Sequence, residues 1–214
     1  MSRFQTALVL AMVCGIAPPA SAAGLTVIEL FQSQGCSSCP PANANVMALG
    51  ERPDLLALSF GVTYWDQLGW KDTFASPQYT ERQWDYARAF HRRNVFTPEV
   101  VVNGRADIVG ADRGELEALI RREGTLAGPA IEIGKDSVTI GMGTGTAAVW
   151  LVRYDPSIIQ VPVARGENGG GRFARMFVGL APGWVADAGK KVSAEDVSDH
   201  IEQIAMFAGG GVGP

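Results

Sequence analysis

Cysteine and histidine are scarce in this chain, which has three cysteines and two histidines among its 214 residues. The histidines, His91 and His200, are far apart in the sequence, and only one closely spaced cysteine pair is present. Because a structural zinc site takes four ligands, mostly Cys and His, this chain alone is not expected to bind zinc. Two thiolates are sufficient ligands for copper(I), so a metal-binding role of the pair stays open.

The chain also lacks an excess of basic residues and, after residue 22, any long apolar run. Its formal net charge is −4, which gives no electrostatic support for binding a nucleic acid. No later apolar stretch approaches the roughly 20 residues that a membrane-spanning helix needs. We therefore expect no nucleic-acid partner and no membrane span. The length suits one domain, or one domain with an appendage.

Residues 1–22 have the pattern of a secretory signal peptide. An arginine lies near the N-terminus, an apolar run over residues 7–16 is too short to cross a bilayer, and residues 20–22 are small, as a cleavage site requires. Cys14 lies in the apolar run and is expected to leave with the leader. It could instead attach a lipid, but Val13 occupies the preceding position, where a small residue is usual. We expect an exported protein, periplasmic or secreted, in a compartment where disulfides persist.

The two cysteines that follow the leader, Cys36 and Cys39, are separated by two serines and followed by Pro40. A disulfide across two intervening residues closes a very short loop, so it constrains the unfolded chain little. A Cys-x-x-Cys pair at the start of a helix instead forms a reversible dithiol–disulfide couple. Cys36 is the predicted nucleophile, because unpaired N–H groups at the helix start favour its thiolate, and Cys39 is the predicted resolving cysteine.

Strands and helices are expected to alternate through the first half of the chain, which makes it an α/β protein. Residues 25–31 and 55–62 are largely apolar on both faces, which is typical of central parallel strands joined by a helix. The other expected elements are helices at 40–49, 76–94 and 112–124 and strands at 100–102 and 106–109.

The pattern changes at residue 129 to short strands separated by Gly, Asp and Pro turns. No Pro-rich or Ser-rich linker separates the two parts, so we expect residues 129–208 to form a β-rich C-terminal extension packed on a domain over residues 23–128. The expected elements are strands at 131–133, 138–140, 147–154, 159–163 and 172–180, a helix at 193–207 and a flexible tail at 209–214. Residues 166–171 lack the ending of a phosphate-binding loop and are interpreted as a flexible hairpin loop.

Four stretches carry a resemblance to a known family. They are Gly-Cys-Ser-Ser-Cys-Pro-Pro within residues 29–41, the aromatic segment 64–72, Thr97-Pro98 with Val-Val-Asn-Gly at 101–104, and Arg-Gly-Glu-Asn at 165–168. Together they resemble a family of predicted secreted bacterial proteins with a thioredoxin-like fold and no assigned function. The resemblance covers nearly the whole chain after the leader. It implies a thioredoxin-like sandwich, a mixed sheet with flanking helices, and it supplies no substrate.

The likeness to thioredoxin-like proteins also implies roles for residues outside the cysteine pair. Thr97 and Pro98 are expected to form a cis-proline element beside the pair, where the residue before the proline presents backbone groups to a substrate. The alternative is a trans proline that starts a strand. Glu29 is expected to be a buried acid that accepts the proton of Cys39, or else a salt-bridged or solvated strand residue.

Trp65 and Trp70 lie in the loop after the second expected strand. They are expected to line a substrate groove beside the cysteine pair. The alternative is that both rings pack in the core or cover the edge of the sheet.

The leading prediction is a periplasmic or secreted thiol–disulfide oxidoreductase that works without a cofactor. Its partner would be a thiol or disulfide of a protein or a small molecule. Two alternatives stay open. The first is a copper(I)-binding protein that uses Cys36 and Cys39, and the second is a partner-binding protein whose C-terminal half performs the recognition. The sequence indicates neither the direction of electron flow nor the oligomeric state.

Overall fold

The computed structural model describes residues 24–125, 131–133, 137–140, 148–180, 191–193 and 204–209. The expected signal peptide over residues 1–22 lies outside these residues. Within the described part of the chain, no helix combines the length and apolar character that crossing a membrane requires.

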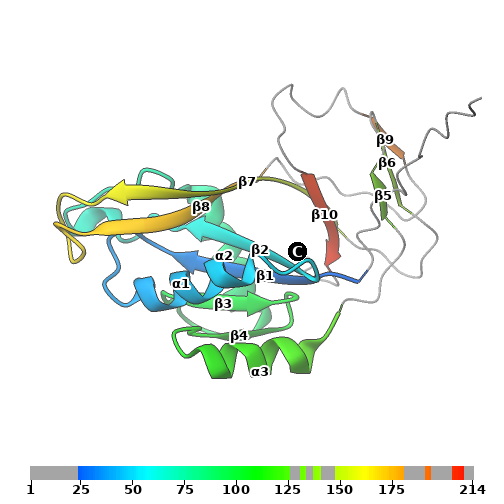
Figure 1. The fold of residues 1–214 in the computed structure, drawn as a ribbon, viewed down its shortest axis with the longest axis horizontal. Helices are drawn as coiled ribbons and strands as arrows, with labels where there is room; N and C mark the ends of the chain where they lie inside the picture. Colours follow the sequence, from blue (N-terminus) through cyan, green and yellow to red (C-terminus); the bar gives the residue numbers. More distant parts are fainter. Residues whose placement is uncertain are drawn as a thin grey trace, which may run out of the picture.

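A mixed four-stranded sheet with flanking helices forms the first half of the protein (Figure 1). The strand order is β2-β1-β3-β4, in which β1 and β2 are parallel and the other neighbours are antiparallel. The strands are β1 (Thr26–Gln32), β2 (Leu55–Gly61), β3 (Glu99–Val102) and β4 (Ala106–Ile108), and the helices are α1 (Cys39–Leu49), α2 (Pro77–Ala89) and α3 (Arg113–Glu123). The α/β sandwich expected from the sequence is therefore present.

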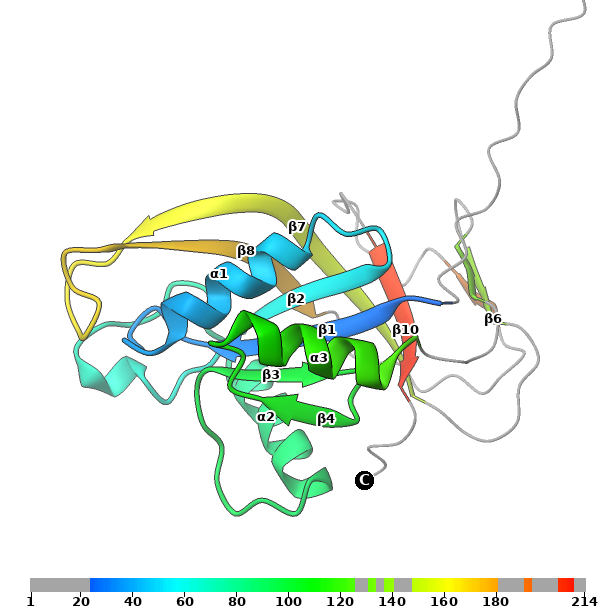
Figure 2. The same ribbon diagram turned by 60° about the horizontal axis from the view of Figure 1, so that its bottom comes forward.

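The two faces of the sheet bury separate apolar clusters. Ile28 and Leu30 of β1 pack with α1 and α3, whereas Val27 and Phe31 pack with α2. Figure 2 shows α1 and α3 on one side of the sheet and α2 on the other. Since successive side chains of a strand point to opposite faces, a central strand covered on both sides is expected to be largely apolar in both sets of positions.

The ends of the helices follow local sequence signals. Ser76 caps α2 by accepting a hydrogen bond from the Gln78 amide, and Asp112 caps α3 by accepting one from the Glu115 amide. The helix expected at 76–94 ends earlier, at Ala89. His91 has a positive φ of 56°, and this left-handed backbone stops the helical hydrogen-bond pattern.

The C-terminal part is all β among the described residues and forms two three-stranded sheets, β10-β7-β8 and β5-β6-β9. The helix expected at 193–207 is wrong over the residues that are described. Ser193 ends a strand, and residues 204–207 belong to β10. β10 pairs antiparallel with β7, so hydrogen bonds to a distant strand override a local helical pattern. The strands here are β5 (Ile131–Ile133), β6 (Ser137–Ile140), β7 (Ala148–Pro162), β8 (Arg172–Leu180), β9 (Lys191–Ser193) and β10 (Ile204–Gly209).

The flexible tail expected at 209–214 is wrong at its first residue, since Gly209 belongs to β10. Its pairing partner in the sheet is Ala148 of β7. Residues 210–214 lie outside the described residues.

β7 is one long strand where two were expected. Its register with β8 shifts between Asp155 and Ile158, which is a β-bulge around Pro156. A proline has no N–H for the ladder, and a bulge tolerates that loss. β7 and β8 together form a long hairpin that lies beside α1 and β2 (Figures 1 and 2).

Candidate functional site: a buried cysteine pair beneath a hairpin

Cys36 and Cys39 form a disulfide at the start of α1, with their Cα atoms 5.4 Å apart. Cys39 is the first residue of the helix, and two prolines follow it in the first turn, where their missing N–H groups cost no helical hydrogen bond. Both cysteine side chains have an exposed fraction of 0%. The sequence placed the pair correctly at a helix start, and the structure adds that the pair is fully covered.

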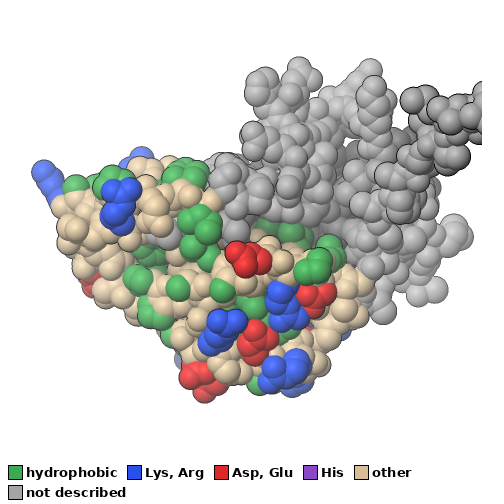
Figure 3. Space-filling model, in the orientation of Figure 1, with side chains coloured by type: hydrophobic (Ala, Val, Ile, Leu, Met, Phe, Trp, Pro, Cys, Tyr) green, Lys and Arg blue, Asp and Glu red, His purple; other side chains and the backbone are tan. Residues whose placement is uncertain are grey.

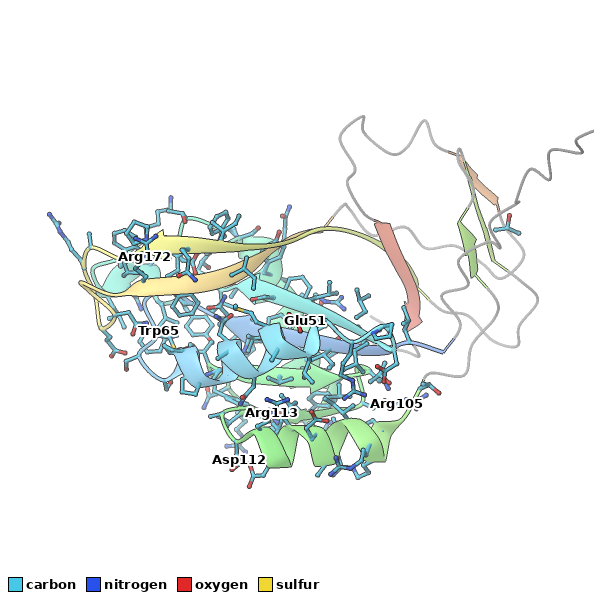
Figure 4. The ribbon with its side chains drawn as sticks, viewed as in Figure 1. Glu51, Trp65, Arg105, Asp112, Arg113 and Arg172 are labelled. Atoms are coloured by element: carbon cyan, nitrogen blue, oxygen red, sulfur yellow. A yellow bond between two sulfur atoms is a disulfide. The ribbon has the colours of Figure 1, made fainter. Side chains whose placement is uncertain are left out.

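Side chains from both halves of the chain cover the disulfide. Val163 and Phe173, which flank the end of the β7–β8 hairpin, are buried in one cluster with the two cysteines, and Trp65 and Trp70 pack against that cluster. Figure 4 shows Trp65 beside the hairpin that carries Arg172. The predicted groove residues therefore lie at the cysteine pair, where they help to bury it.

The loop of this hairpin is hydrogen-bonded to the cysteine motif. Glu167 Oε2 accepts from the Ser37 backbone N–H at 3.0 Å and from Ser37 Oγ at 2.7 Å. Asn168 Nδ2 donates to the carbonyl oxygens of Gln34 at 2.9 Å and Cys36 at 2.8 Å. Four hydrogen bonds thus join residues that are 130 to 134 positions apart in the sequence.

The charge of Glu167 matters for the chemistry of the pair. The hydrogen bonds from Ser37 hold the pKa of the Glu167 carboxyl below its usual value. The carboxylate bonds the Ser37 backbone N–H just before α1, where the partial positive charge of a helix N-terminus favours an anion. A negative charge at this position opposes a second one on Cys36 Sγ.

Thr97 also lies at the pair, as the sequence predicted. The Thr97–Pro98 peptide bond is cis, also as predicted. Ser38 Oγ lies 3.3 Å from Cys36 Sγ and donates to the Thr97 carbonyl at 3.4 Å. Trp65 Nε1 donates to Thr97 Oγ1 at 2.7 Å. Ser38 therefore connects Cys36 to the Thr97 carbonyl, and Trp65 holds the Thr97 side chain.

Trp70 is fixed on the other side of the motif. Its Nε1 donates to Gln34 Oε1 at 2.9 Å, and the hairpin passes close to it. A Cβ on Gly166, whose φ is +79°, would lie 3.2 Å from the Trp70 Cβ. Glycine fits both the positive φ and this close approach.

Glu29 is held by α2. Its carboxylate forms an ion pair with Arg82 at 2.7 Å and accepts a hydrogen bond from the Tyr86 hydroxyl. Burial, together with the Glu29 charge, raises the pKa of Tyr86 well above its usual value, so the phenol stays a donor. These contacts match the salt-bridged alternative for Glu29, and its proton-transfer role toward Cys39 stays a prediction.

A polar network from α2 supports the segment that carries Thr97. Gln83 is fully buried, and its Nε2 donates to the Phe96 carbonyl at 2.7 Å and to Glu99 Oε2 at 2.6 Å. Tyr64 donates from its hydroxyl to Gln83 Oε1 at 3.2 Å. Burial raises the pKa of Tyr64 to about 12, so this donor also stays protonated at neutral pH.

Glu99 makes the stability of the protein depend on pH. Burial raises the pKa of Glu99 from 4.5 to about 7, and the neighbouring Asp107 charge adds to this. Between these values the folded state binds more protons than the unfolded state, so this group's contribution to the free energy of unfolding falls as the pH rises. Glu99→Gln imitates the protonated acid and is expected to be more stable than the wild type above pH 7, by about 2 kcal/mol.

Urea unfolding of both proteins from pH 4.5 to pH 8 measures this effect. The difference between the two free energies of unfolding should be small at pH 4.5 and should grow as the pH rises toward 8. A difference that does not change with pH would contradict the assignment of the titration to Glu99.

Sequence reasoning missed Ser37, Glu167 and Asn168 as members of the site. Residues 166–171 were expected to be a flexible hairpin loop, but the loop is tied to the cysteine motif. The one sequence signal for it was the Arg-Gly-Glu-Asn stretch among the motifs that carried the family resemblance. Nothing local to the loop indicates what it contacts.

No group of three or more His, Cys, Asp or Glu side chains comes together as a metal site in the part of the chain that the structure describes. Cys36 and Cys39 are bonded to each other, so they would have to be reduced before they could bind copper(I). Figure 3 shows acidic and basic side chains interspersed on the face that carries α1 and α3. Among the described residues in this view, no patch of a single sign is seen.

The fold and the site define an α/β sandwich protein with a buried Cys-x-x-Cys disulfide at the start of a helix. The chain belongs to the family described as "Protein of unknown function (DUF1223)", which matches residues 27–209. It is similar to the X-ray crystal structure of an Agrobacterium tumefaciens protein, a structural genomics target, with 33% identity and a TM-score of 0.62. That similarity covers 81% of this chain and 80% of the other. The search of curated proteins found no match.

Proposed function

We propose that the protein is an exported thiol–disulfide oxidoreductase with a thioredoxin-like fold. The observation that carries the proposal is the Cys36–Cys39 disulfide at the start of α1, which Ser38 Oγ links to the Thr97 carbonyl. The strand order β2-β1-β3-β4, with parallel β1 and β2 and helices on both faces, supports the fold assignment. Export is inferred from the pattern of residues 1–22, and it would place the pair where disulfides persist.

The proposed reaction exchanges one disulfide for another. A thiolate of a partner dithiol attacks Cys36 Sγ, the Cys36–Cys39 bond breaks, and Cys39 leaves as a thiolate and takes up a proton. The second partner thiolate then attacks the partner sulfur of the mixed disulfide, and Cys36 leaves and is protonated. Two electrons and two protons pass from the partner to the cysteine pair. The reverse sequence of steps reduces a partner disulfide.

Groups around the pair would assist these steps. The start of α1 favours negative charge on Cys36 as it leaves or attacks. Thr97 offers a carbonyl beside Cys36, and Trp65 and Trp70 would line the site once a partner is seated. Glu29 would act as the proton acceptor only if its ion pair with Arg82 opened.

Disulfide exchange tests the proposal, either between the reduced protein and insulin or between the oxidised protein and a model dithiol peptide. Cys36→Ser is expected to lower the rate by at least about 100-fold, because the nucleophile is removed. Cys39→Ser serves as the matched control, since it also lacks the disulfide but keeps Cys36. With insulin, its Cys36 thiolate should attack a disulfide sulfur and release an insulin thiol, and the resulting mixed disulfide should accumulate and be detectable by mass. Equal exchange rates for the wild type and Cys36→Ser would disprove the proposal.

A further inference from the structure

The end of the β7–β8 hairpin, residues 163–173 and here named the cap, closes the only cysteine pair of the described chain. Both sulfur-bearing side chains have an exposed fraction of 0%, and a disulfide with that exposure cannot meet an attacking thiolate. Exchange therefore requires a movement that uncovers Cys36. The elements that cover it are the cap and the loop that carries Trp65 and Trp70.

We propose that Glu167 and Asn168 are the residues that determine which thiols reach the pair, because they latch the cap over it. This inference rests on the proposed function and specifies how its site is controlled. With the latch closed, small thiols are kept from the disulfide. A protein partner opens the latch by placing an extended segment on the cysteine motif.

The hydrogen bonds of the latch indicate how a partner would replace it. The cap contributes one acceptor and one donor group to the cysteine motif. The acceptor is the Glu167 carboxylate, which bonds Ser37. The donor group is the Asn168 side-chain amide, which bonds the carbonyl oxygens of Gln34 and Cys36. Three of these four bonds go to backbone groups of the motif. The backbone of an extended polypeptide carries the same N–H donors and C=O acceptors, so a partner segment can take over the contacts. A small thiol has few groups with which to do so.

The construction of the hairpin allows the cap to move as a unit. β10 pairs with β7 over residues 148–153, before the bulge between Asp155 and Ile158. Beyond the bulge, β7 pairs with β8 alone among the described strands. The loop is closed internally, since the Val163 amide donates to the Gly171 carbonyl and the Gly170 amide donates to the Val163 carbonyl. The bulge thus separates the part of the hairpin that pairs with β10 from an end whose strand pairing and loop hydrogen bonds are internal to the hairpin.

The charge of the latch has a chemical consequence. While the cap is closed, the Glu167 carboxylate occupies the Ser37 backbone N–H, which is one of the groups that would stabilise a Cys36 thiolate. Opening the cap removes a negative charge and frees this donor. Exposure and activation of Cys36 would then occur in the same movement.

The test measures reduction of the Cys36–Cys39 disulfide by excess dithiothreitol, followed by thiol trapping and mass. The variant Glu167→Ala/Asn168→Ala loses all four latch bonds, so its reduction is expected to be at least about tenfold faster than that of the wild type. Arg165→Ala is the matched control, an exposed side chain in the same loop, and it should react like the wild type. Ser37→Ala weakens the latch from the α1 side without changing the hairpin and should give a smaller acceleration.

The outcomes separate this inference from the proposed function. Equal reduction rates for the wild type and the latch variant, or an equal acceleration by Arg165→Ala, would overturn the latch. The protein exchange assay would be unaffected by that result. Faster reduction of the latch variant without any protein disulfide exchange would retain the latch and reject the oxidoreductase. Should the latch variant fail to fold by circular dichroism, a wild-type rate for Ser37→Ala would overturn the inference.

Discussion

Glu29→Leu is expected to lower the free energy of unfolding by about 3–5 kcal/mol, because it removes the carboxylate that forms the ion pair with the buried Arg82 guanidinium. Glu29 is 1% exposed and Arg82 is 9% exposed, and their ion pair is 2.7 Å long. The substitution also removes the acceptor of the Tyr86 hydroxyl, and an unsatisfied buried donor adds to the cost. Urea unfolding at neutral pH measures the loss.

The double variant Glu29→Leu/Arg82→Met is the control for this prediction. Replacing both charges by apolar side chains of similar size is often nearly neutral, so the double variant should recover most of the stability that the single variant loses. A double variant that is less stable than Glu29→Leu would contradict the ion-pair explanation. Reduction rates of the disulfide in the same variants also test the proton-transfer role of Glu29, since a purely structural role should leave the double variant close to the wild type.

Gly110→Ala is expected to lower the free energy of unfolding by about 3 kcal/mol, through a strained backbone and a collision in the core. Gly110 has a φ of +76°, and a Cβ there would lie 2.4 Å from Val100 Cγ2. Val100 is fully buried in β3 between α1 and α3, so it cannot move away without disturbing its neighbours. Thermal or urea unfolding measures the effect.

Gly104→Ala is the matched control because it measures the cost of a strained backbone without a collision. Gly104 has a φ of +65°, but a Cβ there would have its nearest contacts at 3.6 Å, on the Tyr86 ring. It should therefore cost only about 1–2 kcal/mol. Adding Val100→Ala to Gly110→Ala should cost less than the sum of the two single losses, since the colliding methyl is gone. Additive losses in this pair would mean that the collision is not the cause.

The sequence alone determined the features that depend on neighbouring residues. The caps at Ser76 and Asp112 were predictable because a side chain there reaches amides within the next few residues. The turn at Asn103-Gly104 was predictable because both residues accept a positive φ. The Cys-x-x-Cys spacing, followed by proline, likewise placed the pair at the start of α1.

Only the tertiary structure decided the partners of these elements. Residues 204–209 became a strand because β7 offers them a ladder of hydrogen bonds, and no local pattern reports a partner that lies some 50 residues away. Glu29 faces Arg82 because β1 and α2 pack together. The burial of Cys36 arises from a hairpin whose end lies about 130 residues further along the chain. Hydrophobic burial and strand pairing bring these residues together. Both act between segments that are distant in the sequence, and the sequence near one segment does not show which other segment it will contact.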